Sequence, residues 1–317
     1  MAETGKDITR AKALLEAGKL VAIPTETVYG LAANALNVEA VTGIYLSKNR
    51  PYFDPLIVHV GEMSAVMNYV EDIPSKALEL MKKFWPGPLT ILLPKKNIIP
   101  DLVTAGLDRV GIRCPNHPMT YQLLRSLSFP LAAPSANPFG YVSPTTPKHV
   151  DEQLGSKIEY ILDGGDCVVG VESTIIGFEQ GDSVIYRVGG LSLEKIESVI
   201  GQVRMNVHVS SNPLSPGQMQ SHYAPGKPLL LGNISQLYHE NEKSTLAVLS
   251  FREEYHLSNL RNQIVLSPSG NVDEAAQRLF SALRELDKTD VDFILAEEVP
   301  DVGLGRAIND RLRRAAH

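Results

Sequence analysis

Residues 20–60 read LVAIPTETVYGLAANALNVEAVTGIYLSKNRPYFDPLIVHV, and their pattern decides the fold class of the chain. The apolar run 20–24 predicts a short buried strand that ends in a polar turn. A helix is predicted over 38–47, and the apolar run 56–60 predicts a further buried strand. A strand, a helix and a second strand within about forty residues are typical of an α/β domain.

The same alternation continues beyond this stretch. Helical patterns cover 7–17, 63–70, 75–84, 117–127 and 192–200. Further strands are predicted at 89–93, 110–113, 131–134, 158–162, 174–177 and 184–187. Short apolar strands between amphipathic helices predict an α/β sheet for the first two hundred residues.

The composition changes near residue 202. Residues 202–228 are rich in Ser, Pro and Gly, which is typical of an ordered but irregular linker. Strands and helices resume beyond it, at 229–231, 245–250, 264–266, 272–286, 293–296 and from about Arg306. We therefore expect a catalytic domain at 1–201, a linker or lid at 202–228 and a smaller α/β accessory domain at 229–317.

The composition narrows the classes of function. The 317 residues carry a formal net charge of −6, and neither half of the chain has an excess of Lys and Arg. A protein that grips a phosphate backbone usually has a basic domain, so any nucleic acid is expected to be only an indirect partner. The two cysteines predict neither a disulfide framework nor a zinc site. No apolar run spans a membrane and no leader peptide is visible, so we expect a soluble, cytoplasmic protein without membrane contact.

Cations follow several of the predicted elements. Lys48, Arg50, Arg113 and Arg187 lie at the end of a helix or strand, where ligands bind in α/β sheets. Arg suits bidentate capture of carboxylate or phosphate, and Lys acts as a point charge. The simpler interpretation is a solvated helix end for the first two and a surface ion pair for a strand-end Arg.

Polar loops accompany these cations. The turn at Thr25 either positions a polar ligand or only satisfies its own backbone, and His59 is by itself more typical of a hydrogen-bonded core histidine. The loop 132–147 places small residues, hydroxyls and prolines directly after a strand, without the residue order of a Walker A loop. Residues 170–175 add further hydroxyls, and Glu172 among them is a candidate for binding a cation. The Tyr and His of the linker are a candidate lid. Together these features favour an enzyme that positions a polyanion and a small polar substrate.

Nine stretches in this order resemble one family. They are PTETVYGLAANA (24–35), SKNRPYFDPLIVHV (47–60), WPGPLTILL (85–93), TAGLDRVGIRCPNHP (104–118), AAPSANPFGYVSPTT (132–146), DGG (163–165), GVESTII (170–176), RVGG (187–190) and SPGQMQSHYAP (215–225). The chain resembles the YrdC-type threonylcarbamoyl-AMP synthases, in the long form with a C-terminal domain that ends in GLGRAINDRLRRAA (303–316). This resemblance implies a twisted, open, mixed α/β sheet with a concave basic face, followed by a smaller Rossmann-like α/β domain.

The resemblance also implies roles for single residues. The side chains implied around L-threonine are Thr25, His59, Arg113, Ala133 and Ser173, with Arg113 on the carboxylate. Those implied around ATP are Lys48, Arg50, Ser135, Asn137, Ser143, Arg187, His222 and Tyr223. Among them Lys48, Arg50 and Arg187 are implied to be catalytic, and no protein ligand is assigned to a metal. The C-terminal helix receives no catalytic role; its segment 306–314 is expected to be a solvated face or a contact for another protein.

The implied activity is that of a nucleotidyltransferase. L-threonine, bicarbonate or CO2, and ATP would give L-threonylcarbamoyl-AMP and pyrophosphate, with Mg²⁺ as the expected companion of ATP. The product would pass to the machinery that forms N6-threonylcarbamoyladenosine in tRNA. Two positions depart from the family pattern, Asp54 where Asn is usual and Phe139 where a small residue is usual, and we expect neither to touch a site residue.

Two alternatives stay open at this stage. An RNA-binding module without adenylating activity would explain a concave basic face, although the acidic balance of the chain opposes it. A carbamoyl-transfer domain would explain similar motifs, although such proteins carry further large catalytic domains that this chain lacks.

Overall fold

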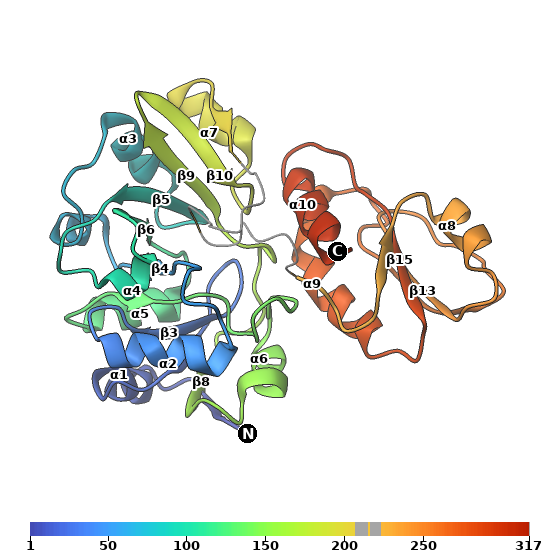
Figure 1. Cartoon of the computed structure of the whole chain (residues 1–317), viewed down its shortest axis with the longest axis horizontal. Helices are drawn as coiled ribbons and strands as arrows, with labels where there is room; N and C mark the ends of the chain where they lie inside the picture. The colour runs from blue at the N-terminus through green and yellow to red at the C-terminus, as the bar shows by residue number, and fades with distance from the viewer. Residues whose placement is uncertain (207–214, 216–222, 317) are drawn as a thin grey trace.

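The computed structural model describes residues 1–206, 215 and 223–316, and it forms two sheets, each covered by helices (Figure 1). The first sheet has eleven strands in the order β1-β8-β2-β3-β7-β4-β6-β5-β9-β10-β11 and mixes parallel with antiparallel pairs. The second has four parallel strands in the order β12-β15-β13-β14. This arrangement confirms the predicted mixed α/β sheet and the second, smaller α/β unit.

The elements of the first unit follow the predicted alternation. Its strands are β1 (Glu3–Gly5), β2 (Val21–Ile23), β3 (Gly30–Asn34), β4 (Ile57–His59), β5 (Leu89–Pro94), β6 (Arg109–Arg113), β7 (Leu131–Ala132), β8 (Tyr160–Leu162), β9 (Thr174–Glu179), β10 (Asp182–Arg187) and β11 (Arg204–Met205). Its helices are α1 (Ile8–Glu16), α2 (Val38–Lys48), η1 (Met63–Asn68), α3 (Ser75–Phe84), α4 (Asp101–Thr104), α5 (Pro118–Ser126), α6 (Pro147–Leu154) and α7 (Leu193–Ile200).

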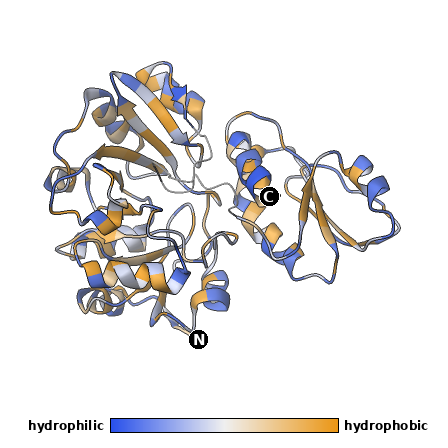
Figure 2. Ribbon diagram, in the orientation of Figure 1, coloured by the Kyte–Doolittle hydropathy of each residue, from blue (hydrophilic) through white to orange (hydrophobic). Residues whose placement is uncertain are grey.

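The second unit repeats the alternation on a smaller scale. Its elements are β12 (Leu229–Leu231), α8 (Ile234–Glu240), β13 (Leu246–Ser250), β14 (Leu260–Val265), α9 (Val272–Asp287), β15 (Phe293–Ala296) and α10 (Gly305–Ala315). Figure 1 shows α9 and α10 on the side of this sheet that faces the first unit. The strands of both sheets are largely apolar, while polar residues lie on the outer faces of the helices (Figure 2).

Local sequence explains several element ends. Asp7 accepts hydrogen bonds from the backbone N–H groups of Thr9 and Arg10, so α1 begins with a side-chain cap. Asn49 follows α2 in the left-handed conformation, which ends that helix. The predicted helix 63–70 is instead a 3₁₀ helix, with no side-chain cap at Glu62.

Some elements differ from the prediction. β3 was not predicted as a strand: it begins at Gly30, the last residue of the predicted polar turn, and its small residues Gly30, Ala32 and Ala33 have no alternation of polar and apolar side chains. β11 pairs with β10, so the first sheet receives a strand beyond the predicted boundary at residue 201. In the part of the chain that the structure describes, no helix is long and apolar enough to cross a membrane.

Candidate functional site

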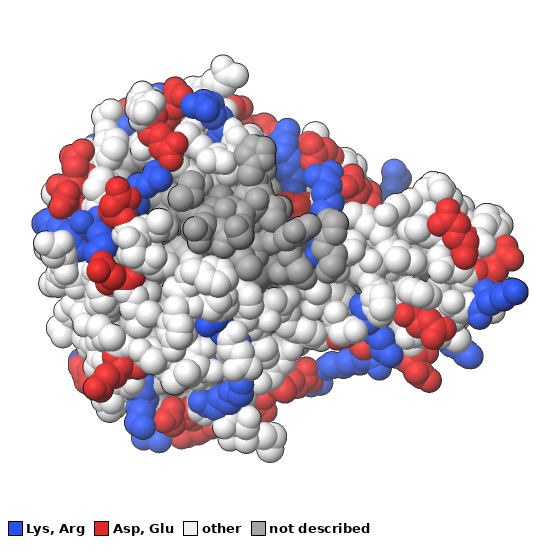
Figure 3. Space-filling view, viewed as in Figure 1, with Lys and Arg blue, Asp and Glu red and all other residues white. Residues whose placement is uncertain are grey.

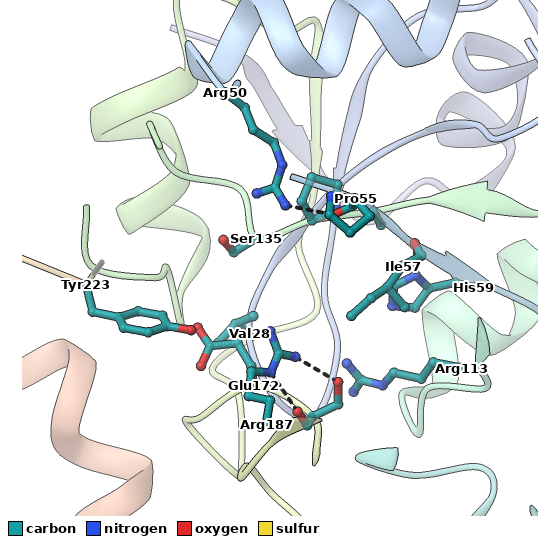
Figure 4. Close-up of a pocket in the computed structure, with 13 residues that line it drawn as sticks. Val28, Arg50, Pro55, Ile57, His59, Arg113, Ser135, Glu172, Arg187 and Tyr223 are labelled. Atoms are coloured by element: carbon teal, nitrogen blue, oxygen red, sulfur yellow. Dashed lines mark hydrogen bonds between the residues drawn. The ribbon is translucent and has the colours of Figure 1, made fainter. Parts of the chain in front are cut away.

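A pocket lies where β4, β6 and β10 end and the loop after β7 begins (Figure 4). Its wall contains many of the predicted site residues, namely Arg50, His59, Arg113, Ala133, Ser135, Ser173, Arg187 and Tyr223. Strand register explains part of this convergence, because His59 of β4 pairs directly with Arg113 of the parallel strand β6. Residues in register on neighbouring strands point to the same face of a sheet.

Arg113 is paired inside the protein rather than at the surface. Its Nη2 lies 2.8 Å from Oε2 of Glu26, and both side chains are at most 5% exposed. The distance is that of an ion pair, although neither the Glu26 oxygens nor Nη2 has a hydrogen bond of regular geometry among the described residues. Sequence reasoning missed Glu26; the signal available was an acid between two threonines in the turn that follows β2.

His59 is a buried, neutral histidine. Burial, together with the nearby charge of Arg113, lowers its pKa to about 3. Its Nδ1 lies 3.3 Å from the carbonyl oxygen of Ile57, which is a donor contact when Nδ1 carries the proton. A group with this pKa is a weak base near neutral pH, so the ring can orient a substrate by hydrogen bonding.

Thr25 forms a local turn. Its hydroxyl accepts from the backbone N–H groups of Thr27 and Val28, at 3.1 and 3.2 Å, and lies 2.7 Å from the carbonyl oxygen of Val28 as a donor. This is the backbone-satisfying turn that the sequence allowed as the simpler interpretation. Thr25 is buried and is not part of the pocket wall.

Arg187 is hydrogen-bonded to Ser173. Arg187 donates from Nε to the carbonyl oxygen of Ser173 and from Nη2 to its hydroxyl, both at 3.1 Å. The same hydroxyl lies 2.7 Å from the hydroxyl of Thr90 on β5. The backbone at Gly189 packs directly against the backbone at Glu172. Only glycine fits there, because a Cβ would lie 2.2 Å from the carbonyl oxygen of Glu172.

Lys48 lies behind the pocket. Its ammonium donates to the carbonyl oxygen of Ser135, at 2.6 Å, and to that of Asn137. Burial, reinforced by the neighbouring charge of Arg50, holds its pKa well below the usual range. Lys48 and Asn137 thus hold the loop after β7 in shape, and only Ser135 of this group faces the pocket.

Arg50 corrects one prediction. Its guanidinium forms an ion pair with Asp54, at 2.9 Å, donates to the carbonyl oxygen of Pro55, at 2.8 Å, and lies 5.8 Å from the ring centre of Phe139. The expectation that Asp54 and Phe139 touch no site residue is therefore wrong. The reason is spatial: the turn after α2 and the loop after β7 meet at the same guanidinium.

Glu172 joins the predicted Ser143 to a residue far along the chain. Ser143 donates its hydroxyl to Oε1 of Glu172 at 2.6 Å, and Arg311 of α10 donates from Nε to Oε2 at 3.1 Å. Sequence reasoning noted Glu172 only as a candidate for binding a cation. The predicted solvated face or protein contact at 306–314 is wrong for Arg311 and Arg314, which are buried in this chain.

The remaining predicted ligands can be placed in part. Tyr223 lines the pocket, and His222 lies outside the described residues. Among the residues that the structure describes, no three His, Cys, Asp or Glu side chains gather to hold a metal. Glu172 is the one carboxylate in the described pocket wall and is already engaged by Ser143 and Arg311, so these residues do not form a Mg²⁺ cage.

Two family models together match nearly the whole chain. The model of Sua5, YciO and YrdC proteins, described as telomere recombination, matches residues 13–189. A model described as the C-terminal domain of threonylcarbamoyl-AMP synthase matches residues 191–317. The two matches meet at residues 189–191, just before α7.

Individual proteins extend this similarity over both units. The threonylcarbamoyl-AMP synthase of Pyrococcus abyssi is 41% identical, over 96% of this chain and 93% of its own. That of Bacillus subtilis is 42% identical, over 98% and 92%. The crystal structure of P. abyssi Sua5 complexed with L-threonine is 39% identical, covers 100% of this chain and 97% of its own, and superposes with a TM-score of 0.91.

Proposed function

The chain belongs to the family of Sua5, YciO and YrdC proteins, and on that premise we infer that it makes L-threonylcarbamoyl-AMP from L-threonine, bicarbonate or CO2, and ATP. It is a nucleotidyltransferase of the threonylcarbamoyl-AMP synthase class, as are its relatives over nearly its full length. The observation that carries the residue-level proposal is the meeting of Arg50, Arg113 and Arg187 in one pocket, since threonine brings a carboxylate and ATP a triphosphate.

The threonine end of the pocket would lie around Arg113. Its guanidinium would take the substrate carboxylate, with Glu26 holding it from behind at 2.8 Å. His59, Ala133 and Ser173 would complete the wall around the small side chain, and they line the same pocket. The L-threonine complex of P. abyssi Sua5 supports a threonine site in this fold.

The nucleotide end would lie around Arg50, Arg187 and Ser135. The two guanidinium groups would neutralise phosphate oxygens, and Ser135 would add a donor from the loop after β7. Lys48 and Asn137 would act from behind by holding this loop, and Ser143 would act by orienting Glu172. Tyr223 and the neighbouring His222 would close the nucleotide site from the linker.

The reaction would proceed in two steps. The threonine amine forms a bond to the carbon of CO2 and releases a proton to solvent, which gives N-carboxy-threonine. An oxygen of the new carboxylate then attacks the α-phosphorus of ATP, and pyrophosphate leaves with the electron pair of the broken P–O bond. The nucleophile is already an anion, so the protein needs no Ser or Cys nucleophile.

Positioning would supply most of the catalysis. Two anions must meet, and the cations of the pocket offset their repulsion. Holding them in line gives effective molarities of ~10⁵ M or more in well-oriented systems. Mg²⁺ carried by the ATP phosphates would add further charge neutralisation, without requiring a protein cage.

The division into residues 1–201, 202–228 and 229–317 belongs to the same proposal, with the last unit supporting the first. The product would serve the transfer of threonylcarbamoyl to tRNA, with tRNA itself only an indirect partner. The RNA-binding alternative finds no support among the relatives, which are named synthases. On the face drawn in Figure 3, blue and red side chains are interspersed, and the pocket arginines are buried.

The test is pyrophosphate release from ATP, with threonine and bicarbonate each omitted in turn. Release that needs both co-substrates, together with a product that contains labelled threonine and AMP, is the expected result. Release that needs neither, or a folded protein that releases none in any mixture, would overturn the proposal. In the second case, salt-dependent binding of RNA without ATP turnover would establish the alternative.

A further inference from the structure

One buried ion pair crosses from the second unit into the pocket. Arg311 of α10 has a side chain with 0% exposure, and its Nη2 lies 3.1 Å from Oε2 of Glu172. Its Nε donates to the same oxygen at 3.1 Å, and its Nη1 donates to the carbonyl oxygen of Val188 at 2.8 Å. Both partners belong to the first unit, so this one side chain joins the C-terminal helix to the pocket wall.

Glu172 is the point at which this pair meets the nucleotide end of the site. Its side chain lines the pocket together with Arg187, and its other oxygen accepts the hydroxyl of Ser143. An uncompensated carboxylate there would repel an incoming triphosphate. Arg311 supplies the compensating charge from outside the wall, because it is buried behind Glu172 and is not itself a lining residue.

Tyr223 is held by the same helix pair. The centre of its ring lies 5.1 Å from Cζ of Arg311. The ring also stacks on that of Phe280 of α9, with the two ring centres 5.6 Å apart. Its backbone has a φ of 67°, a left-handed conformation that a bulky residue rarely adopts unless its surroundings impose it. Figure 4 shows the ring pointing toward Glu172 at the edge of the pocket.

The ion pair of Arg311 is not the only one between the described residues of the two units. Arg306 pairs with Glu194 at the exposed rim, and Lys288 pairs with Glu152 at 2.8 Å, both away from the pocket. A buried ion pair contributes little net stability, because desolvation of the two charges offsets their attraction. The location of Arg311, against a pocket carboxylate and a pocket tyrosine, therefore indicates a role in the site.

We propose that Arg311 is a positioning residue of the ATP site, which compensates Glu172 and supports Tyr223 so that nucleotide binding depends on docking of the C-terminal unit. The proposal rests on the proposed function, since it assigns ATP to this end of the pocket. Binding linkage is reciprocal, so ATP in turn strengthens the docking of α10. The C-terminal unit thereby acts on the chemistry without contacting either substrate.

The first experiment measures the dissociation constant of a non-hydrolysable ATP analogue in the absence of threonine. Arg311→Gln is expected to weaken binding by about tenfold or more, which corresponds to about 1.4 kcal/mol. Adding Glu172→Gln to that variant is expected to recover most of the loss, because no unpaired carboxylate then faces the nucleotide. Arg311→Lys keeps the positive charge but loses the planar set of guanidinium N–H donors. Its dissociation constant is expected to lie between those of the unchanged protein and Arg311→Gln.

Matched controls separate this role from packing. Arg313→Gln removes an exposed ion pair of the same helix with Glu298, and Arg306→Gln removes an exposed pair between the units. Both are expected to bind the analogue as the unchanged protein does. Equal weakening in these controls, or an Arg311→Gln loss that Glu172→Gln does not recover, would overturn the proposal. If Arg311→Gln fails to fold, Arg311→Lys with and without Glu172→Gln makes the same comparison.

The second experiment measures hydrogen exchange of the α10 amides with and without the analogue. Slower exchange with the analogue, and a smaller effect in Arg311→Lys, are expected from reciprocal linkage. An analogue effect that is identical in both proteins would contradict the coupling. Pyrophosphate release by the unchanged protein separates the outcomes, because its failure refutes the proposed function, while altered analogue binding bears on Arg311 alone.

Discussion

Exchanging the guanidinium of Arg113 for a neutral amide, in an Arg113→Gln variant, will weaken threonine binding and leave ATP binding nearly unchanged. A hydrogen bond to a charged group contributes about 1.5–3 kcal/mol, and each 1.4 kcal/mol is about tenfold in affinity. We therefore expect the KM for threonine to rise about ten- to a hundredfold. Arg113 is assigned to the carboxylate of threonine, while Arg50 and Arg187 are assigned to ATP.

The same exchange also tests the buried pair behind the site. Glu26, only 4% exposed, loses its partner at 2.8 Å, and removing one partner of a buried pair costs about 3–5 kcal/mol of stability. The double variant Glu26→Gln/Arg113→Gln removes both charges, so it should recover stability without recovering threonine affinity. Loss of binding and loss of folding are thereby separated.

The assay is steady-state pyrophosphate release with threonine and ATP varied in turn, next to urea unfolding of each variant. Arg109→Gln is the matched control, because Arg109 lies on the same strand and pairs with Glu179 away from the pocket. The reasoning is refuted by a folded Arg113→Gln variant whose KM for threonine is unchanged. An equal rise of the KM for ATP would refute it as well.

Three further outcomes follow from the site. Asp54→Ala should lose about 3–5 kcal/mol of stability in urea unfolding and raise the KM for ATP, because it leaves the charge of Arg50 without its partner, whereas Asp54→Asn should lose less. Gly189→Ala should reduce pyrophosphate release strongly, because its Cβ would lie 2.2 Å from the carbonyl oxygen of Glu172. The pKa of His59 is lowered from 6.5 to about 3 in the folded protein, so its neutral form stabilises the fold above pH 6.5 and this stability is lost as the pH falls toward 3. Urea unfolding between pH 7 and pH 4 should therefore show a smaller acid loss in His59→Gln.

A specific result would contradict each of these three predictions. An Asp54→Ala variant as stable as the unchanged protein would show that the ion pair with Arg50 is unimportant. Full activity in Gly189→Ala would show that the chain there moves without cost. Equal acid sensitivity in His59→Gln and the unchanged protein would show that His59 is not the group that titrates.

Residue patterns predicted the α/β class well, because each buried strand is a separate apolar run and each long helix has an apolar stripe. α1, α3 and α9 lie where the 3.6-residue period placed them. β3 was missed because its small residues show no period, although tertiary pairing with β2 and β7 makes it a strand.

Among the candidate site residues, the cations were visible in the sequence and their acidic partners were not. Arg50, Arg113 and Arg187 stand out in the sequence because they follow predicted helices and strands at the ends where ligands bind in α/β sheets. Glu26 and Glu172 stand out much less, because an acid in a polar turn looks like any surface acid until its burial and its partner are known. Asp54 and Phe139 were misjudged for that reason, since only the folded chain brings both to Arg50.

By itself, then, the sequence determined the alternation of strands and helices, the class of chemistry and the cations that serve it. Only the tertiary structure decided which acids pair with those cations and which loop Lys48 supports. It also decided that Arg311 contacts Glu172 in the pocket wall, although the two residues are 139 positions apart in the chain. The physical reason is that periodicity and composition report on neighbours in sequence. The contacts of Lys48 with Ser135 and of Arg311 with Glu172 join residues 87 and 139 positions apart, and no local pattern encodes them.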